Sequence, residues 1–301
     1  MKKHLPSIAV LLALLLAFCL HALALENRAV DTVETSPSAD GTATLELVQT
    51  SAAVTADGVA SSPQVSAAGS SPQQTPTTAT IENTLYLSVV PVLNALFPEV
   101  KTDLTDGRLS AAGDALRLEA TADTAYFMVN DRYFYVPHLV VLEAGALMLP
   151  AETLAEALGC TLTTNQQDGT LSLAKSGQPA AAGAYEEEDL YWLSRAIYSE
   201  SGNQPMKGRI AVGTVILNRV AHEAFPNTIK DVIFAPGQFS PVANGTIYHD
   251  PDEESVIAAK LCLDGVREAG ESLYFNVTSM VSWADHSRTL YCTIGDHNFY
   301  L

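Results

Sequence analysis

The chain has 301 residues, 48% of them hydrophobic, which is enough material for two modest cores rather than one large one. Its 34 acidic residues outnumber 16 basic ones, and the net charge of −18 argues against a nucleic-acid partner, because phosphate binding depends on clustered Lys and Arg. Four scattered cysteines are too few for a disulfide scaffold or a paired Cys-x-x-Cys metal site. We therefore expect two domains, with no metal and no cofactor.

The N-terminus has the features of a secretion signal. Lys2 and Lys3 precede an apolar run over residues 5–20, and Ala22-Leu23-Ala24 provides a small-x-small cleavage site. A single-pass anchor is the competing interpretation, but the run is shorter than the roughly 20 residues that a spanning helix needs. Residues 1–24 are thus predicted to be a signal peptide, and the protein is expected to be secreted.

Residues 25–80 are rich in Ala, Ser, Thr, Gly, Pro and Gln and contain almost no aromatic side chain. Such a composition buries too little apolar surface to offset the entropy of ordering the chain. This segment is predicted to be a disordered linker.

Residues 81–176 contain an internal duplication. The same offset separates Leu96 from Leu158 and the turn Asp106-Gly107 from Asp168-Gly169. Each copy predicts a strand, a short helix, a strand, a tight turn and a strand, because Asp-Gly favours a type I′ hairpin and the flanking residues alternate. A further hairpin is predicted between the copies, turning at Asn130-Asp131.

This duplicated segment resembles the copper amine oxidase N-terminal-like domain, a small β-rich module of secreted proteins. No metal is implied, because the segment has one histidine, His138, and one cysteine, Cys160. A spacer or targeting role follows, in association with the cell wall or a membrane.

The chemistry is predicted in residues 185–301. Leu193, Ile197 and Glu200 fall at helical spacing, so Glu200 lies on the apolar face of a helix that Ser201-Gly202 ends. The negative end of the helix dipole and apolar neighbours both disfavour an ionised carboxylate, so its pKa should rise. A carboxyl protonated near neutral pH can protonate a glycosidic oxygen. A structural Glu that hydrogen-bonds to the next loop remains the alternative.

Ordered motifs along this segment carry a resemblance to a known family. They are residues 193–200 (LSRAIYSE), 208–220 (GRIAVGTVILNRV), 225–229 (FPNTI), 232–234 (VIF), 237–240 (GQFS), 274–276 (YFN) and 295–300 (GDHNFY). With these motifs the segment resembles the SleB/CwlJ family of cell-wall hydrolases along essentially its whole length.

That resemblance implies a mostly helical, lysozyme-like domain that degrades peptidoglycan with Glu200 as the catalyst. Family members are implicated in spore cortex breakdown during germination, and some are lytic transglycosylases. In that reaction one glutamate protonates the leaving oxygen and then deprotonates the 6-hydroxyl of N-acetylmuramic acid, which gives a 1,6-anhydro product. The chain departs from the family pattern at Gln204, where an acid is usual, so the role of that acid is in doubt here.

Amide and aromatic residues are the types that line sugar grooves. We expect Gln238, Phe239, Tyr274 and Asn276 to contact the glycan, although core packing explains these residues equally well.

The prediction is therefore an α+β protein, with a small β-rich duplicated module followed by a helical catalytic domain that cleaves the MurNAc-GlcNAc strand. A non-catalytic peptidoglycan-binding protein and a plain muramidase are the alternatives. A muramidase would use a second carboxylate, for which Asp231, Asp250, Asp285 and Asp296 are candidates. The sequence leaves open whether the target is spore cortex or vegetative wall, whether muramic lactam is needed, and whether Cys262 and Cys292 pair.

Overall fold

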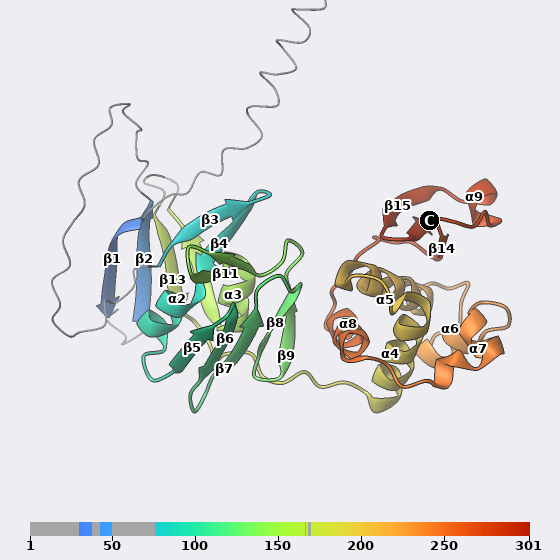
Figure 1. The fold of residues 1–301 in the computed structure, drawn as a ribbon, viewed down its shortest axis with the longest axis horizontal. Coiled ribbons are helices and arrows are strands. Elements are labelled where there is room, and N and C mark those ends of the chain that lie inside the picture. The colour runs from blue at the N-terminus through green and yellow to red at the C-terminus, as the bar shows by residue number, and fades with distance from the viewer. Residues whose placement is uncertain (1–29, 38–42, 50–75, 166, 168–169) are drawn as a thin grey trace, which may run out of the picture.

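The computed structural model describes residues 30–37, 43–49, 76–165, 167 and 170–301. They form a β-rich N-terminal part and a mostly helical C-terminal part, joined by an irregular segment over residues 176–186 (Figure 1). This division confirms the predicted α+β class. The predicted signal peptide lies outside the described residues. Within them, no helix combines the length and the hydropathy needed to cross a membrane.

The N-terminal domain is built from three antiparallel sheets and two short helices. The sheets have the strand orders β1-β2-β13-β12, β10-β11-β4-β3 and β5-β6-β7-β8-β9. The elements are β1 (Val30–Pro37), β2 (Ala43–Gln49), β3 (Thr78–Ile81), β4 (Thr84–Ser88), α2 (Val89–Leu96), β5 (Lys101–Thr105), β6 (Arg108–Ala112), β7 (Arg117–Thr121), β8 (Tyr126–Val129), β9 (Arg132–Tyr135), β10 (Val141–Glu143), β11 (Ala146–Pro150), α3 (Ala151–Ala157), β12 (Cys160–Thr164) and β13 (Leu171–Lys175).

Two of these strands correct the prediction that residues 25–80 form a disordered linker. β1 and β2 both lie within that stretch, and β2 pairs with β13 in a register that places Leu45 opposite Leu173. Leu45 is completely buried in the core of the domain. Composition alone does not reveal this strand, because the strand that pairs with it lies far along the chain. The domain also starts before residue 81, because β3 begins at Thr78.

The two predicted copies contain the same order of elements. β4, α2, β5 and β6 follow one another in the first, and β11, α3, β12 and β13 in the second. Positive φ angles at Asp106 and Gly107, and at Asn130 and Asp131, give these two predicted hairpin turns the left-handed backbone of a type I′ turn. The predicted turn at Asp168-Gly169 lies outside the described residues.

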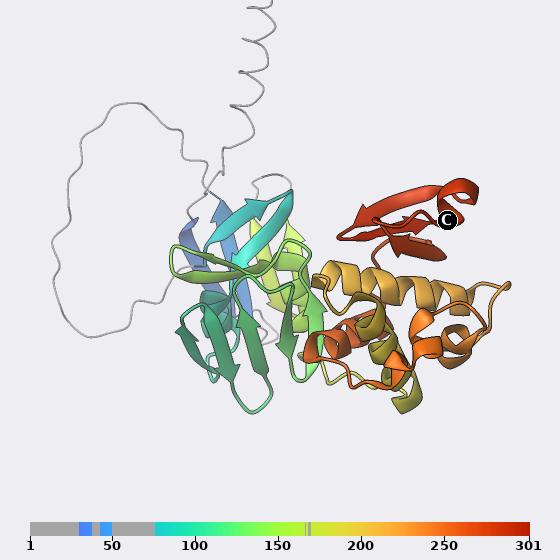
Figure 2. The same cartoon turned by 45° about the vertical axis from the view of Figure 1, so that its right-hand side comes forward.

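The C-terminal domain is a helical bundle that carries one small sheet. Its elements are α4 (Glu187–Ser201), α5 (Met206–Ala221), α6 (Ile229–Phe234), α7 (Ser240–Asn244), η1 (Thr246–Tyr248), α8 (Glu253–Leu263), β14 (Tyr274–Val277), α9 (Ala284–Ser287), β15 (Leu290–Ile294) and β16 (His297–Tyr300). α4, α5 and α8 pack against one another, and the sheet β14-β16-β15 lies across α5 (Figure 2). The core between these elements includes Leu193, Ile197, Val215 and Phe299.

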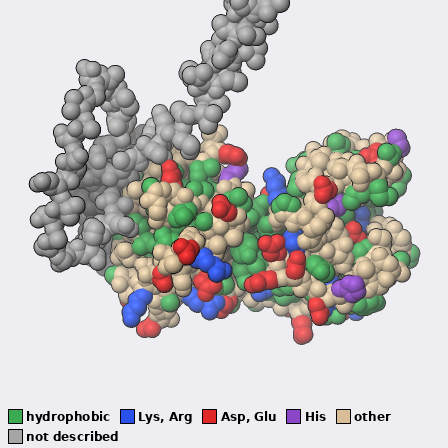
Figure 3. Space-filling model, in the orientation of Figure 1, with side chains coloured by type: hydrophobic (Ala, Val, Ile, Leu, Met, Phe, Trp, Pro, Cys, Tyr) green, Lys and Arg blue, Asp and Glu red, His purple; other side chains and the backbone are tan. Residues whose placement is uncertain are grey.

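Three further features concern the surface, the cysteines and metal binding. On the face drawn in Figure 3, acidic side chains are spread over both domains. Cys160, Cys262 and Cys292 are all free thiols, so Cys262 and Cys292 do not pair in this structure. The described part of the chain contains no cluster of three or more side chains of the types that hold a metal ion.

Candidate active site

Glu200 lies in the last turn of α4, as the sequence predicts. Its side chain is half-buried, and burial raises its pKa from the ordinary 4.5 to about 7, while the positive charge of Arg219 opposes part of this rise. A pKa near neutrality leaves a large fraction of the carboxyl protonated at pH 7 and lets it accept a proton afterwards. The side chain thus has the acid–base properties that the sequence suggested.

The end of α4 is fixed directly after Glu200. Ser201 is completely buried, and its hydroxyl donates a hydrogen bond to the carbonyl oxygen of Ile197 at 2.8 Å. Gly202 follows with φ −60°, so a left-handed backbone is not the reason for glycine here. Space is the reason, because an added Cβ would lie 2.6 Å from the carbonyl oxygen of Tyr198. The turn at Gly202 therefore lies so close to the last turn of α4 that any side chain at position 202 would push the turn away from the helix.

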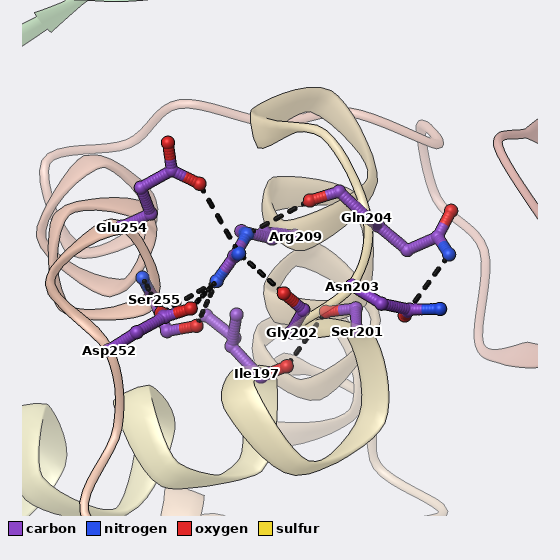
Figure 4. Close-up of polar contacts among 9 residues, drawn as sticks. All are labelled: Ile197, Ser201, Gly202, Asn203, Gln204, Arg209, Asp252, Glu254 and Ser255. Atoms are coloured by element: carbon purple, nitrogen blue, oxygen red, sulfur yellow. Dashed lines mark hydrogen bonds and ion pairs between the residues drawn. The ribbon is translucent and has the colours of Figure 1, made fainter.

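Arg209 ties this turn to α5 and α8 (Figure 4). The residue is 4% exposed, and its guanidinium donates to the carbonyl oxygens of Gly202 at 2.5 Å and Gln204 at 3.0 Å. It also donates to Asp252 Oδ1 at 2.7 Å and to Ser255 Oγ. One buried cation therefore satisfies the free carbonyls after α4 and anchors them to the start of α8.

Gln204, which stands where the family usually has an acid, binds the C-terminal hairpin. Its Oε1 accepts from the backbone N–H of Asp296 at 3.0 Å, and its Nε2 donates to Asp296 Oδ2 at 3.0 Å. The side chain is 5% exposed and packs against Gly295, where an added Cβ would lie 2.2 Å from Oε1. An amide suits this place because it both donates and accepts, whereas a carboxylate would face Asp296 with a like charge. Gln204 thus has a structural partner in this chain.

The site contains a residue that the sequence analysis did not select. Arg219, near the end of α5, is 5% exposed, and its Nε donates to the carbonyl oxygen of Leu273 at 2.7 Å. Three aromatic rings surround its guanidinium carbon, with centroids at 5.2 Å for Phe225, 5.3 Å for Phe239 and 5.6 Å for Tyr274. The cation is thus held among π-faces, which attract positive charge.

Arg219 and Glu200 act on each other electrostatically. Burial lowers the pKa of Arg219 to about 10, although Tyr274 and Glu200 both favour its charged form. A signal for this pair was present in the sequence, because Val215, Ile216 and Arg219 fall on one face of an apolar helix. A charged residue on that apolar face is unusual, just as Glu200 is unusual on the apolar face of α4.

The structure brings together only some of the predicted binding residues. Phe239 is 5% exposed, and Tyr274 is half-buried on β14; both contact Arg219. Asn276 instead donates to the carbonyl oxygen of Met280 and to Asp285, so it holds a loop. Gln238 is exposed in the turn before α7. Contact between these four residues and a glycan stays a prediction.

The loop held by Asn276 lies beside Tyr274. Asp285 accepts hydrogen bonds from Tyr300 Oη at 2.5 Å, from the Ser282 backbone at 2.6 Å and from Asn276. The hydrogen bond from Tyr300, followed by that from the Ser282 N–H, contributes most to lowering the pKa of Asp285 to about 2. The loop carries Trp283, 57% exposed, whose ring lies 5.3 Å from that of Tyr274. An exposed indole on an anchored loop is suited to stacking on a sugar ring.

Comparison with protein-family models identifies both domains. Residues 203–300 match the family described as Cell Wall Hydrolase, and residues 66–173 match the copper amine oxidase N-terminal domain. Glu200 lies three residues before the first of these matches. The second match begins before the predicted boundary at residue 81.

The similar proteins are spore cortex-lytic enzymes. One from Bacillus cereus is 35% identical over 145 residues, which is 47% of this chain and 56% of the relative. One from Bacillus subtilis is 35% identical over 137 residues, or 44% of this chain and 45% of the relative. The chain thus spans about half the length of the curated relatives it matches.

A solved structure is similar to the same segment. The catalytic domain of the germination-specific lytic transglycosylase SleB from Bacillus anthracis is 35% identical, with a TM-score of 0.38, and the match covers 40% of this chain and 100% of that one. The family models and the relatives agree on the C-terminal assignment. The C-terminal domain is therefore similar to the cell wall hydrolase family, and the N-terminal domain is similar to the copper amine oxidase N-terminal domain.

Proposed function

We propose that the C-terminal domain cleaves the glycan strand of peptidoglycan between MurNAc and GlcNAc, with Glu200 as acid and then as base. The observation that carries this proposal is the carboxyl at the end of α4, whose pKa burial raises to about 7. Such a group donates a proton to the glycosidic oxygen near neutral pH. The similarity to spore cortex-lytic enzymes supports the same chemistry.

We infer that the reaction is a lytic transglycosylation, in which the ionised Glu200 takes the proton of the muramyl 6-hydroxyl and a 1,6-anhydro end forms. A retaining hydrolase would need a second carboxylate about 5 Å away, and its charge would raise the pKa of Glu200 further. Among the described residues, Arg219 is the charged group that alters this pKa. The mechanism with a single acid is therefore favoured over a plain muramidase.

The four candidate aspartates have other partners. The pairs are Asp231 with Thr228, Asp250 with Arg195, Asp285 with Tyr300, and Asp296 with Gln204. These contacts explain why an aspartate occurs at each position without any catalytic role. The contact between Gln204 and Asp296 also weakens the case for a non-catalytic protein, because it gives Gln204 a structural role in the C-terminal hairpin.

The remaining parts of the proposal concern the whole protein. We infer that it is secreted and acts on the cell wall, that its N-terminal domain is a duplicated module for wall or membrane association, and that its catalytic domain is lysozyme-like. The repeated order of strand, helix and two strands supports the duplication. Spore cortex is the favoured target, because the similar proteins are named for cortex lysis.

Digestion of purified sacculi tests the proposal. Wild-type protein and the Glu200→Gln variant are incubated with spore cortex and, separately, with vegetative wall, and the released fragments are weighed by mass spectrometry. We expect anhydro ends, one water lighter than reducing ends, from the wild type alone. Equal release by the variant would refute the role of Glu200, and reducing ends would establish the muramidase alternative.

A further inference from the structure

Arg219 has a hydrogen-bonding edge that the protein leaves unused. Its Nε is bonded to Leu273, but its Nη1 is buried and has no hydrogen-bond partner in the described part of the chain. A buried polar group without a partner is costly, and a charged one more so. Arg219 is 5% exposed, so a partner from outside the protein has to reach it through that small exposed part. An open N–H in such a place is suited to a ligand.

The surroundings of this N–H are aromatic, and the charge of Arg219 acts on the proposed catalytic residue. Phe239 comes from the start of α7 and Tyr274 from β14, and both rings lie within 5.6 Å of the guanidinium carbon. Glu200 from α4 and Tyr274 are the groups whose charges act on Arg219. Of the charged groups on the elements packed against α4, Arg219 alone alters the pKa of Glu200 in the described structure.

We propose that Arg219 is a substrate-binding residue of this site, whose Nη1 donates a hydrogen bond to a carbonyl or carboxylate oxygen of the sugar held against Glu200. The inference rests on the proposed glycan cleavage. An N-acetyl carbonyl and a lactyl carboxyl both supply such an acceptor, and either would give the unpaired Nη1 of the guanidinium a hydrogen-bond partner. The charge of Arg219 has a second effect, because it limits how strongly Glu200 holds its proton.

Two variants separate the hydrogen bond from the charge. Arg219→Lys keeps a positive charge but loses the planar fork, and Arg219→Met loses both. With soluble glycan strands as the substrate, we expect KM to rise about 10-fold or more in both variants, as for a lost hydrogen bond to a charged group. An unchanged KM in both variants would overturn the proposal. If Arg219→Met does not fold, because the bond to Leu273 is also lost, the KM of Arg219→Lys decides.

The pH dependence gives a readout that a structural role would not move. Activity should fall above pH ~7 as Glu200 ionises, and Arg219→Met should move this fall to higher pH, whereas Arg219→Lys should leave it in place. Arg195→Met is the matched control, because Arg195 lies on the same helix as Glu200 and pairs with Asp250. An identical pH profile in Arg219→Met and wild type would count against the proposal.

Two measurements keep this inference distinct from the proposed function. Carbon NMR of labelled glutamate, with Glu200→Gln to assign the signal, follows the ionisation of Glu200 without any cleavage. If Glu200→Gln cleaves like the wild type, the proposed function fails, whereas an unshifted Glu200 titration in Arg219→Met refutes only the inference. Binding of tetra-N-acetylchitotetraose identifies the acceptor: weaker binding in Arg219→Lys indicates an N-acetyl carbonyl, and unchanged binding with a raised KM on muramyl strands indicates the lactyl carboxyl.

Discussion

Replacement of Glu200 by glutamine should make the catalytic domain more stable at neutral and alkaline pH while abolishing cleavage. In the unfolded chain the carboxyl ionises near its ordinary pKa of 4.5, and in the folded domain near 7. Below pH ~4.5 both states are protonated, so burial of the group then carries no ionisation penalty. As the pH rises, the unfolded state loses its proton first, and the stability of the wild type falls until the folded state ionises as well.

The magnitude follows from the two pKa values. Their difference corresponds to about 3 kcal/mol at roughly 1.4 kcal/mol per pKa unit. The isoelectric point of the chain is near 4.6, so measurements belong above pH 5. Between pH 5.5 and 8.5 the wild type should lose about 2 kcal/mol relative to Glu200→Gln, which does not titrate. With a slope of about 2 kcal/mol/M, the urea midpoints should separate by about 1 M over this range.

Tryptophan fluorescence is a suitable probe, because both tryptophans of the chain, Trp192 and Trp283, lie in the catalytic domain. Urea unfolding is measured at several pH values for the wild type, Glu200→Gln and Glu271→Gln. Glu271 is an exposed carboxyl of the same domain, so its removal should leave the pH dependence of the wild type intact. A difference between wild type and Glu200→Gln that stays constant from pH 5.5 to 8.5 would refute the reasoning, because Glu200 would then ionise normally.

Three further substitutions test the scaffold around the site. Gln204→Glu should lower the free energy of unfolding by about 1–3 kcal/mol at pH 7, because it faces Asp296 with a like charge, and acidification should reduce the loss; urea titration at pH 7 and 5.5 measures this. Arg209→Met should cost about 3–5 kcal/mol, because it leaves buried acceptors unpaired, and a melting temperature within 2 °C of the wild type would contradict this role. Gly213→Ala should cost about 1–3 kcal/mol in urea titration, because its methyl group would lie 2.7 Å from Cys262 Sγ.

Local signals in the sequence were sufficient for the elements that carry the site. Helical spacing placed Glu200 on the inward side of α4, and Ser201-Gly202 placed the end of that helix within a residue of the observed one. The Asn130-Asp131 hairpin was also predictable, because type I′ turns depend on two adjacent residues. In each case the information lies within a few residues along the chain.

Long-range contacts were not predictable in the same way. The strand containing Leu45 was missed because its partner β13 is distant in sequence, and composition alone favoured disorder. The partner of Gln204 is Asp296, which belongs to a hairpin 92 residues further along the chain. Arg219 was overlooked because it lies within an apolar motif, and the rings that surround its charge come from separate segments. A charged residue on an apolar helix face is nevertheless a signal that sequence reasoning can use.

The absence of an ion pair between Glu200 and Arg219 in the described structure helps Glu200 to stay protonated near neutral pH. No ion pair joins them among the described residues, although each perturbs the pKa of the other. A direct contact would favour the carboxylate more strongly and lower its pKa, which would leave a smaller protonated fraction at pH 7. Arg219 is instead held back by Leu273 and by aromatic faces. Arg219 therefore favours the ionised form of Glu200 without cancelling the rise that burial causes in its pKa. In the proposed reaction, this charge would stabilise the carboxylate that remains after proton transfer.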